Sequence, residues 1–247
     1  MTTVGTLNAF LWGLLGGGAL LVGAAAGLAF RVPQRVIGLV MAFGAGVLIS
    51  ALTFELTLDA YDLGGADAVA VGLALGALTF FVGDWIIDER GGRHRKRSGG
   101  QQAEGQAPAI VLGAILDGIP ESIAMGISLL AGGSTSAAFI AAVFVSNVPE
   151  AMSASTGLRK AGARPRSIFI LWAVVALVSG ISSAFGYAAL GGAPDHVKGG
   201  IEAFAGGAIL VMLADTMMPE AFQEAHRAVG LVTVLGYAVG TLLSVAA

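Results

Sequence analysis

The chain is a succession of long apolar runs separated by short polar connections. A membrane-spanning helix needs about 20 mainly apolar residues, and we identify eight runs of about this length. They cover residues 7–30, 36–58, 67–87, 107–130, 137–158, 167–190, 199–222 and 228–246. Only 12% of the residues are charged, against about 25% in soluble domains. We therefore predict an all-α integral membrane protein with eight transmembrane helices, which form a single transmembrane domain over residues 1–247.

Lysine and arginine lie almost entirely in alternate connections between these runs. Twelve of the thirteen follow the first, third, fifth or seventh run, and Lys198 alone lies on the other side. Cytoplasmic loops are enriched in these residues, so we expect both termini outside and location in the cell (plasma) membrane. The longest connection, residues 88–107, is basic and rich in Gly and Gln, which predicts a disordered cytoplasmic loop.

Two similar motifs lie in the middle of the fourth and fifth runs. They read Asp117-Gly-Ile-Pro-Glu121 and Ser146-Asn147-Val-Pro-Glu150. A carboxylate at the centre of a bilayer costs roughly 2.5–3.5 kcal/mol, so Asp117, Glu121 and Glu150 together would cost about 8–10 kcal/mol. Neither run contains Lys or Arg before Arg159. A bound cation is the simplest compensation, and protonated carboxylates in a packed bundle are the alternative.

Helical spacing brings the polar residues of each motif to one face. Residues three or four positions apart share a helix face, which pairs Asp117 with Glu121 and both Ser146 and Asn147 with Glu150. Each motif also contains a proline, which leaves one helix carbonyl without its donor. Two broken helices with acids at the same depth are typical of a transporter's ion site. The predicted metal ligands from this pattern are Asp117, Glu121, Ser146, Asn147 and Glu150.

An internal repeat relates two further runs. Residues 42–61 and 203–222 share five identities in a 20-residue alignment, and the two runs cross the membrane in opposite directions. This predicts an inverted 3+2+3 repeat, in which runs four and five form the middle pair. Acids near the run ends are expected to concentrate cations at an entrance and an exit. They are Glu55, Asp59, Asp215 and Glu220. For Asp59 and Glu220, a solvated interfacial acid stays open as the alternative.

The Pro-Glu motifs, the eight runs with both ends outside and the long connection before the fourth run resemble the ZIP (Zrt-/Irt-like) family of divalent-metal transporters. The resemblance implies transport of zinc, iron, manganese or cadmium into the cytoplasm by alternating access, through a metal centre between the fourth and fifth runs. The metal is then a substrate, and no organic cofactor is expected.

The chain departs from that family at the centre. Asp117 and Ser146 stand where the resemblance implies histidines, and Ser179 stands where many members carry a glutamate in the sixth run. Oxygen donors suit harder ions such as Mn²⁺ or Fe²⁺, whereas imidazole nitrogen suits zinc. The substitutions therefore predict weakened zinc preference and one metal per centre, where the resemblance implies a two-metal centre.

Other function classes find less support in the sequence. The HExxH and GxSxG signatures are absent and there is no cysteine, so we do not expect an enzyme. A non-transporting family member that acts as a metal sensor or scaffold stays open, because both histidines are missing. The expected partners are metal ions and the lipid bilayer, without nucleic acid, and a homodimer is left open.

Overall fold

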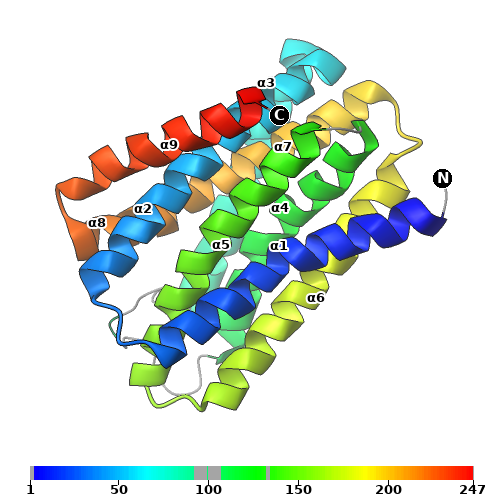
Figure 1. Cartoon of the computed structure of the whole chain (residues 1–247). Coiled ribbons are helices and arrows are strands. Elements are labelled where there is room, and N and C mark those ends of the chain that lie inside the picture. The colour runs from blue at the N-terminus through cyan, green and yellow to red at the C-terminus, as the bar shows by residue number, and fades with distance from the viewer. Residues whose placement is uncertain (1–2, 92–98, 100–106, 132–133, 247) are drawn as a thin grey trace.

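The structure is a computed structural model that describes residues 3–91, 99, 107–131 and 134–246. Over these residues it is a bundle of helices without strands (Figure 1). The elements are α1 (Thr3–Ala29), α2 (Gln34–Ala51), η1 (Leu52–Thr57), α3 (Leu58–Glu89), α4 (Ala107–Ala131), α5 (Ser134–Lys160), α6 (Pro165–Leu190), α7 (Asp195–Met212), η3 (Leu213–Met217), α8 (Met218–Ala225) and α9 (Ala228–Ala246). Most of the predicted basic loop, residues 88–107, lies outside the described residues.

Seven helical stretches in the described part of the chain are long and apolar enough to cross a membrane. The second of them, Gln34–Glu89, is 56 residues long, about 84 Å at 1.5 Å per residue and more than twice the hydrocarbon thickness of a bilayer. It is interrupted at Gly65, which has φ 73°. The connection expected between the runs 36–58 and 67–87 is shorter in the structure, because only Gly65 leaves the helical conformation.

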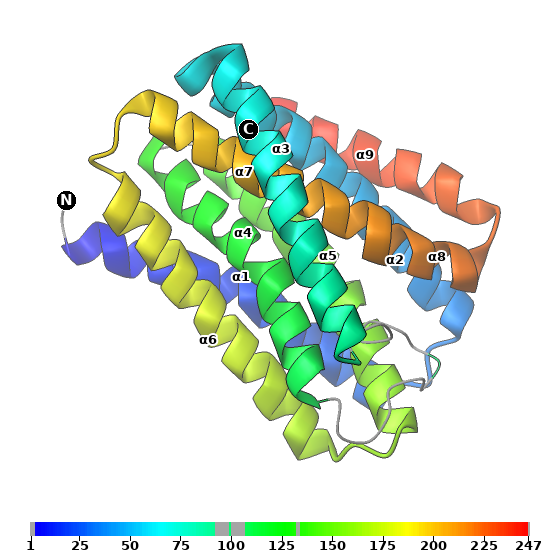
Figure 2. The same ribbon diagram turned by 180° about the vertical axis from the view of Figure 1, so that it is seen from behind.

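Packing against α7 shows that the chain reverses direction at Gly65. A Cβ added to Gly199, near the start of α7, would lie 2.6 Å from the Ala60 carbonyl oxygen. Gly76, beyond the break, meets the Phe204 carbonyl further along the same helix. The part of α3 after Gly65 therefore runs back alongside α7, as Figure 2 shows.

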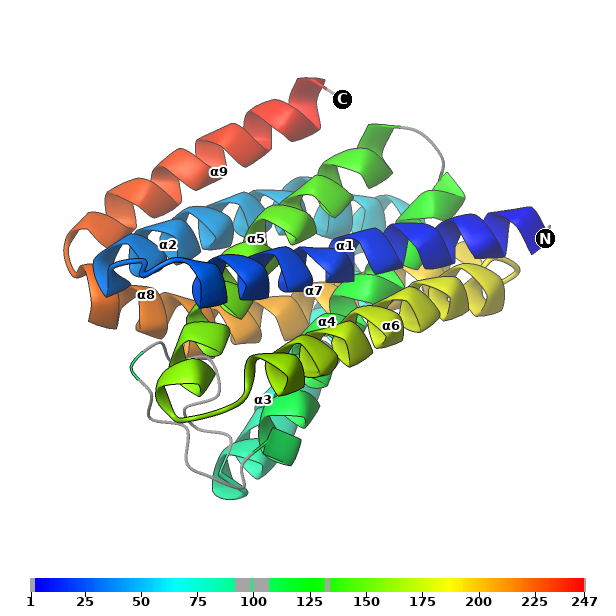
Figure 3. The same cartoon turned by 60° about the horizontal axis from the view of Figure 1, so that its bottom comes forward.

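Helices α1, α4, α5 and α6 form the other side of the bundle. α1 and α6 lie side by side, α1 also packs on α5, and α6 packs on α4 (Figure 3). Small residues allow these close approaches: Gly23 meets the carbonyl of Val148, and a Cβ on Gly186 would lie 2.5 Å from that of Ile123. This packing buries the middle of α4 and α5, where the two Pro-Glu motifs lie.

The stretches Gln34–Glu89 and Asp195–Ala246 repeat one local structure. Helices α2 and α7 each contain 18 residues, and each is preceded by a proline, Pro33 or Pro194. Each continues into a π-helical segment, at Leu52 and at Leu213, two residues that the sequence alignment pairs. The same spacing of 161 residues relates Gly65 to His226, which has φ 53° and is the one non-glycine residue with positive φ in the described chain.

Contacts between helices repeat as well. Gly38 of α2 approaches the Ala221 carbonyl, and Gly199 of α7 approaches the Ala60 carbonyl, which are equivalent pairs in the alignment. Likewise Gly46 meets Thr233 of α9 while Gly207 meets Leu73 of α3, both through a backbone carbonyl. The two ends of the chain lie at the same end of the bundle, opposite the α1–α2 and α5–α6 connections (Figure 1).

Candidate functional site

The three mid-helix carboxylates of α4 and α5 face the interior of the bundle. Asp117, Glu121 and Glu150 are only 4%, 3% and 5% exposed, respectively. Acids within a membrane bundle face its interior or a wet cavity because lipid cannot solvate them. The structure therefore places these predicted residues inside the protein and away from its lipid-facing surface.

Contacts through α1 bring the remaining predicted residues to this level. The amide Nδ2 of Asn147 donates a hydrogen bond to the Gly16 carbonyl over 3.2 Å. The next residue, Gly17, packs on α6, where a Cβ would lie 2.9 Å from Ser179 Cβ. Ser179 Oγ in turn lies 3.5 Å from the Cβ position of Gly118 in α4. Four helices thus meet here, and Ser179 lies against the residue that follows Asp117.

Two buried serines donate their hydroxyl protons to helix carbonyls. Ser146 Oγ donates to the Val143 carbonyl over 3.0 Å, and Ser122 Oγ donates to the Gly118 carbonyl over 2.6 Å. Because a hydroxyl oxygen keeps its acceptor lone pairs when it donates, Ser146 Oγ can still ligate a cation. Asn147 keeps Oδ1 in the same way, since its bond to Gly16 uses Nδ2.

The proline of α5 opens the backbone next to α2. Pro149 cannot donate to the Val145 carbonyl. A Cβ on Gly44 of α2 would lie 3.5 Å from that oxygen and 3.1 Å from Ser146 Cα. Glycine at position 44 therefore lets α2 approach the break closely, and a larger side chain there would press on the motif.

The described part of the chain contains no group of three or more His, Cys, Asp or Glu side chains close enough to hold a metal ion. The three carboxylates share a region of the bundle without forming a ready three-carboxylate cage. The oxygen donors that accompany them are Ser146 Oγ, Asn147 Oδ1 and Ser179 Oγ. Such a set fits Mn²⁺ or Fe²⁺ better than zinc.

The four predicted entrance and exit acids lie in different surroundings. Glu55 in η1 is 3% exposed, Asp59 is half-buried, and Asp215 is exposed beside an apolar groove between α3 and α7. Glu220 is only 4% exposed and accepts a hydrogen bond from Ser153 Oγ over 3.2 Å. The solvated alternative for Glu220 is therefore wrong, because this acid packs against α5 one helical turn beyond Glu150.

Two buried acids were missed by sequence reasoning. Glu202 of α7 is 3% exposed and interacts electrostatically with Asp59. Asp84 of α3 is 8% exposed and interacts electrostatically with Asp215. Each lies within a long apolar run, which is the signal that could have identified them. Neither belongs to a Pro-Glu motif, so the prediction of the site from these motifs did not include them.

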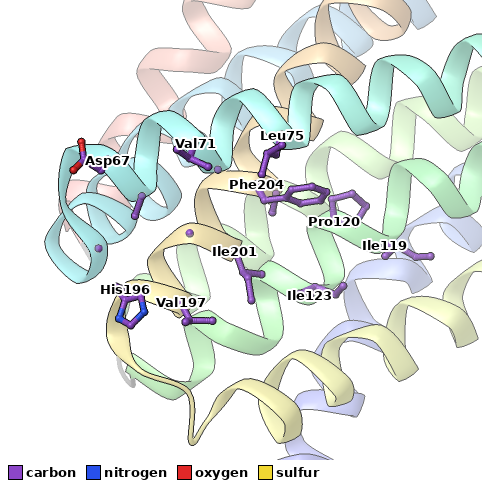
Figure 4. A pocket seen from close by; sticks show the side chains of 15 residues that line it. Asp67, Val71, Leu75, Ile119, Pro120, Ile123, His196, Val197, Ile201 and Phe204 are labelled. Atoms are coloured by element: carbon purple, nitrogen blue, oxygen red, sulfur yellow. The ribbon is translucent and has the colours of Figure 1, made fainter.

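An apolar groove of about 830 Å³ lies between α3, α4 and α7. Figure 4 shows Pro120 next to Phe204 in its wall, with Asp67 and His196 at one end. None of the three central carboxylates lines it. Its walls suit hydrocarbon, so this groove on the back of the α4 motif is not the cation site.

Comparison with models of known protein families gives no match to this chain, and comparison with curated protein sequences gives none either.

Proposed function

We propose that the protein is a permease for divalent metal cations of the zinc, iron and manganese class, which binds its substrate between α4 and α5. The observation that carries the proposal is the burial of Asp117, Glu121 and Glu150 within an apolar helix bundle. Ionisable groups at such depth mark ion pathways in membrane proteins. The two prolines support it, since broken helices supply free carbonyls beside the acids.

On this proposal the chain crosses the membrane eight times as an inverted 3+2+3 repeat, with both termini outside. The break at Gly65 supports two crossings within Gln34–Glu89. The matching π segments and glycine contacts support the repeat. The distribution of Lys and Arg supports this orientation. We propose the plasma membrane as the location, and the resemblance to ZIP transporters supplies the direction of transport, into the cytoplasm.

The cation passes Glu55 and Asp59, binds among the central oxygens and leaves past Glu220. The bond between Ser153 and Glu220 supports this exit, because it connects Glu220 to the helix that carries Glu150. An all-oxygen donor set favours Mn²⁺ and Fe²⁺ over zinc. The sequence contains no ATP-binding signature, so on this proposal transport runs down a gradient or is coupled to another ion.

Metal-resolved uptake into proteoliposomes tests the proposal. Glu121→Gln and Glu150→Gln should each reduce Mn²⁺ uptake by roughly tenfold or more, which corresponds to about 1.4 kcal/mol. Asp67→Asn removes an exposed acid outside the centre and is the matched control. Parent-like uptake by both glutamine variants would refute the central site.

One observation favours the second candidate, a non-transporting sensor or scaffold. No group of three His, Cys, Asp or Glu side chains in the described residues is positioned to hold a metal, which is the weaker arrangement expected of a protein that no longer transports. Such a protein would bind Mn²⁺ in detergent and yet give no uptake. A parent protein that transports excludes this candidate.

A further inference from the structure

Glu202 is a buried acid that neither Pro-Glu motif explains. It lies in the eighth position of α7 and is 3% exposed. Its Oε2 is fully buried and has no hydrogen-bond partner among the described residues. Burying an ionised carboxylate in this way is costly, so its charged form needs a cation to compensate it.

The nearest basic residue does not neutralise Glu202 directly. Lys198 lies one turn earlier on the same helix and interacts with Glu202 only electrostatically. Its ammonium Nζ instead contacts Asp195 Oδ1 at 2.9 Å. The acid that interacts with Glu202 across the helix contact is Asp59, and Asp59 also interacts with Glu55 and Asp62. Asp59 is therefore the acid that acts on Glu202, and it belongs to a wider group of acids at the start of α3.

The internal repeat gives an independent comparison for this position. The spacing of 161 residues that relates α2 to α7 pairs Glu202 with Met41, a fully buried methionine. The fold therefore accepts an apolar side chain of similar length at this place. A carboxylate here is not needed to build the helix contact.

We propose that Glu202 and Asp59 form an outer cation site between α7 and the start of α3, separate from the Pro-Glu centre. The ligand class is a hydrated divalent cation, with two carboxylates from the protein and water in its other positions, as Mn²⁺ and Mg²⁺ accept. The inference rests on the proposed transport function for its purpose: the site captures the ion on its way to the centre.

The position of the site fits capture from the outer side. Gly199, one turn before Glu202, packs against Ala60, the neighbour of Asp59. Asp59 is half-buried, whereas Glu202 is buried. Asp59 is therefore the more accessible of the two carboxylates, and an incoming ion would meet it first.

Equilibrium dialysis of Mn²⁺ against the full-length protein in detergent tests the site separately from transport. We expect two Mn²⁺ ions per chain for the parent and one for Glu202→Gln. Glu150→Gln should also bind one, at the outer site, and Asp67→Asn should bind two. Lys198→Gln should increase the Mn²⁺ affinity of the outer site several fold, because it removes a competing positive charge.

Glu202→Met separates binding from folding, because Met41 shows that methionine packs at the equivalent position. It should lose the outer ion and keep or raise the thermal transition temperature, since apolar replacement of a buried charge is often stabilising. In uptake, Glu202→Gln should raise the half-saturating Mn²⁺ concentration about tenfold and leave the maximal rate close to that of the parent.

Unchanged Mn²⁺ stoichiometry in Glu202→Gln would overturn the outer site, as would loss of both ions together with a lowered transition temperature in Glu202→Met. A parent that binds the Glu202-dependent ion without any uptake keeps the outer site and refutes the transport function. A parent that binds no Mn²⁺ overturns both.

Discussion

The stretches Gln34–Glu89 and Asp195–Ala246 share their backbone but not their charges. Helix length, π segment and turn position agree between them. Yet α7 has Glu202 where α2 has Met41, and η3 has Asp215 where η1 has Phe54. Close backbone contacts therefore maintain the same backbone structure in both stretches. The ionisable side chains are not needed for it and differ between the two.

One polar pair is exchanged between the two stretches. Glu55 of η1 interacts with the hydroxyl of Ser244 in α9. By the contacts that relate Thr233 to Leu73, the equivalent positions hold Thr216 and Asp84. In the first stretch the acid belongs to the π segment and the hydroxyl to the neighbouring helix, whereas in the second stretch these two positions hold a hydroxyl and an acid in reverse order. The two sides of the bundle keep the same pair of functional groups with opposite placement.

The largest effects should come from filling the shared glycine contacts. Gly46→Ala and Gly207→Ala each push a methyl group into a backbone carbonyl, of Thr233 or Leu73. Each should lower the free energy of unfolding by about 2–3 kcal/mol through overpacking, measured as thermal stability in detergent. Gly200→Ala, which has open space around its Cβ position, is the control and should gain up to about 1 kcal/mol.

If only one of these two variants were destabilised, the equivalence of the two stretches would be broken at this level of packing. Equal losses would extend the equivalence from geometry to energetics.

A smaller effect is expected at the paired turns. Gly65→Ala places a side chain at φ 73° and ψ −178°, a region that only glycine occupies easily, and should cost about 1–3 kcal/mol. His226→Gly removes the corresponding strain at φ 53° and should stabilise the protein by about 1 kcal/mol. We expect the transition temperature to fall in Gly65→Ala and to rise in His226→Gly in the same thermal assay. Changes in the same direction would mean that the two turns are not structurally equivalent.

The smallest effect should come from the exposed first turn of α7. Asp195 binds Lys198 at 2.9 Å, and the equivalent position in α2 is Gln34, which donates a hydrogen bond to Glu224 over 3.3 Å. Both contacts are exposed, so Asp195→Asn should cost at most about 0.5 kcal/mol and less at high salt. A loss several times larger would show that this ion pair orders the end of α7.

Much of the fold follows from hydropathy, because each span must satisfy its own backbone in lipid and therefore needs a long apolar run. The connection between the runs 36–58 and 67–87 is shorter than their bounds predicted, because a single glycine with positive φ suffices for the turn. The π segments were not predicted, because they are a property of the backbone hydrogen bonds and not of the hydropathy pattern.

The candidate site was predicted in part for the same physical reason. Asp117, Glu121 and Glu150 were identifiable because charge in an apolar run is expensive, and all three are buried. The burial of Glu220 and the position of Glu202 depend on which helix covers which face. That information lies in glycine contacts between helices far apart in the sequence, which single-run analysis does not reveal.

The two π segments carry one consequence for how this architecture tolerates change. A π turn accommodates one more residue than an α turn, so deleting a single residue within Leu52–Thr57 would restore ordinary helix and rotate the following side chains by about 100°. Asp59 would then leave the face that it now shares with α7, and the matching deletion in Leu213–Met217 would turn Glu220 away from Ser153. The extra residue in each π segment therefore determines the direction in which Asp59 and Glu220 point.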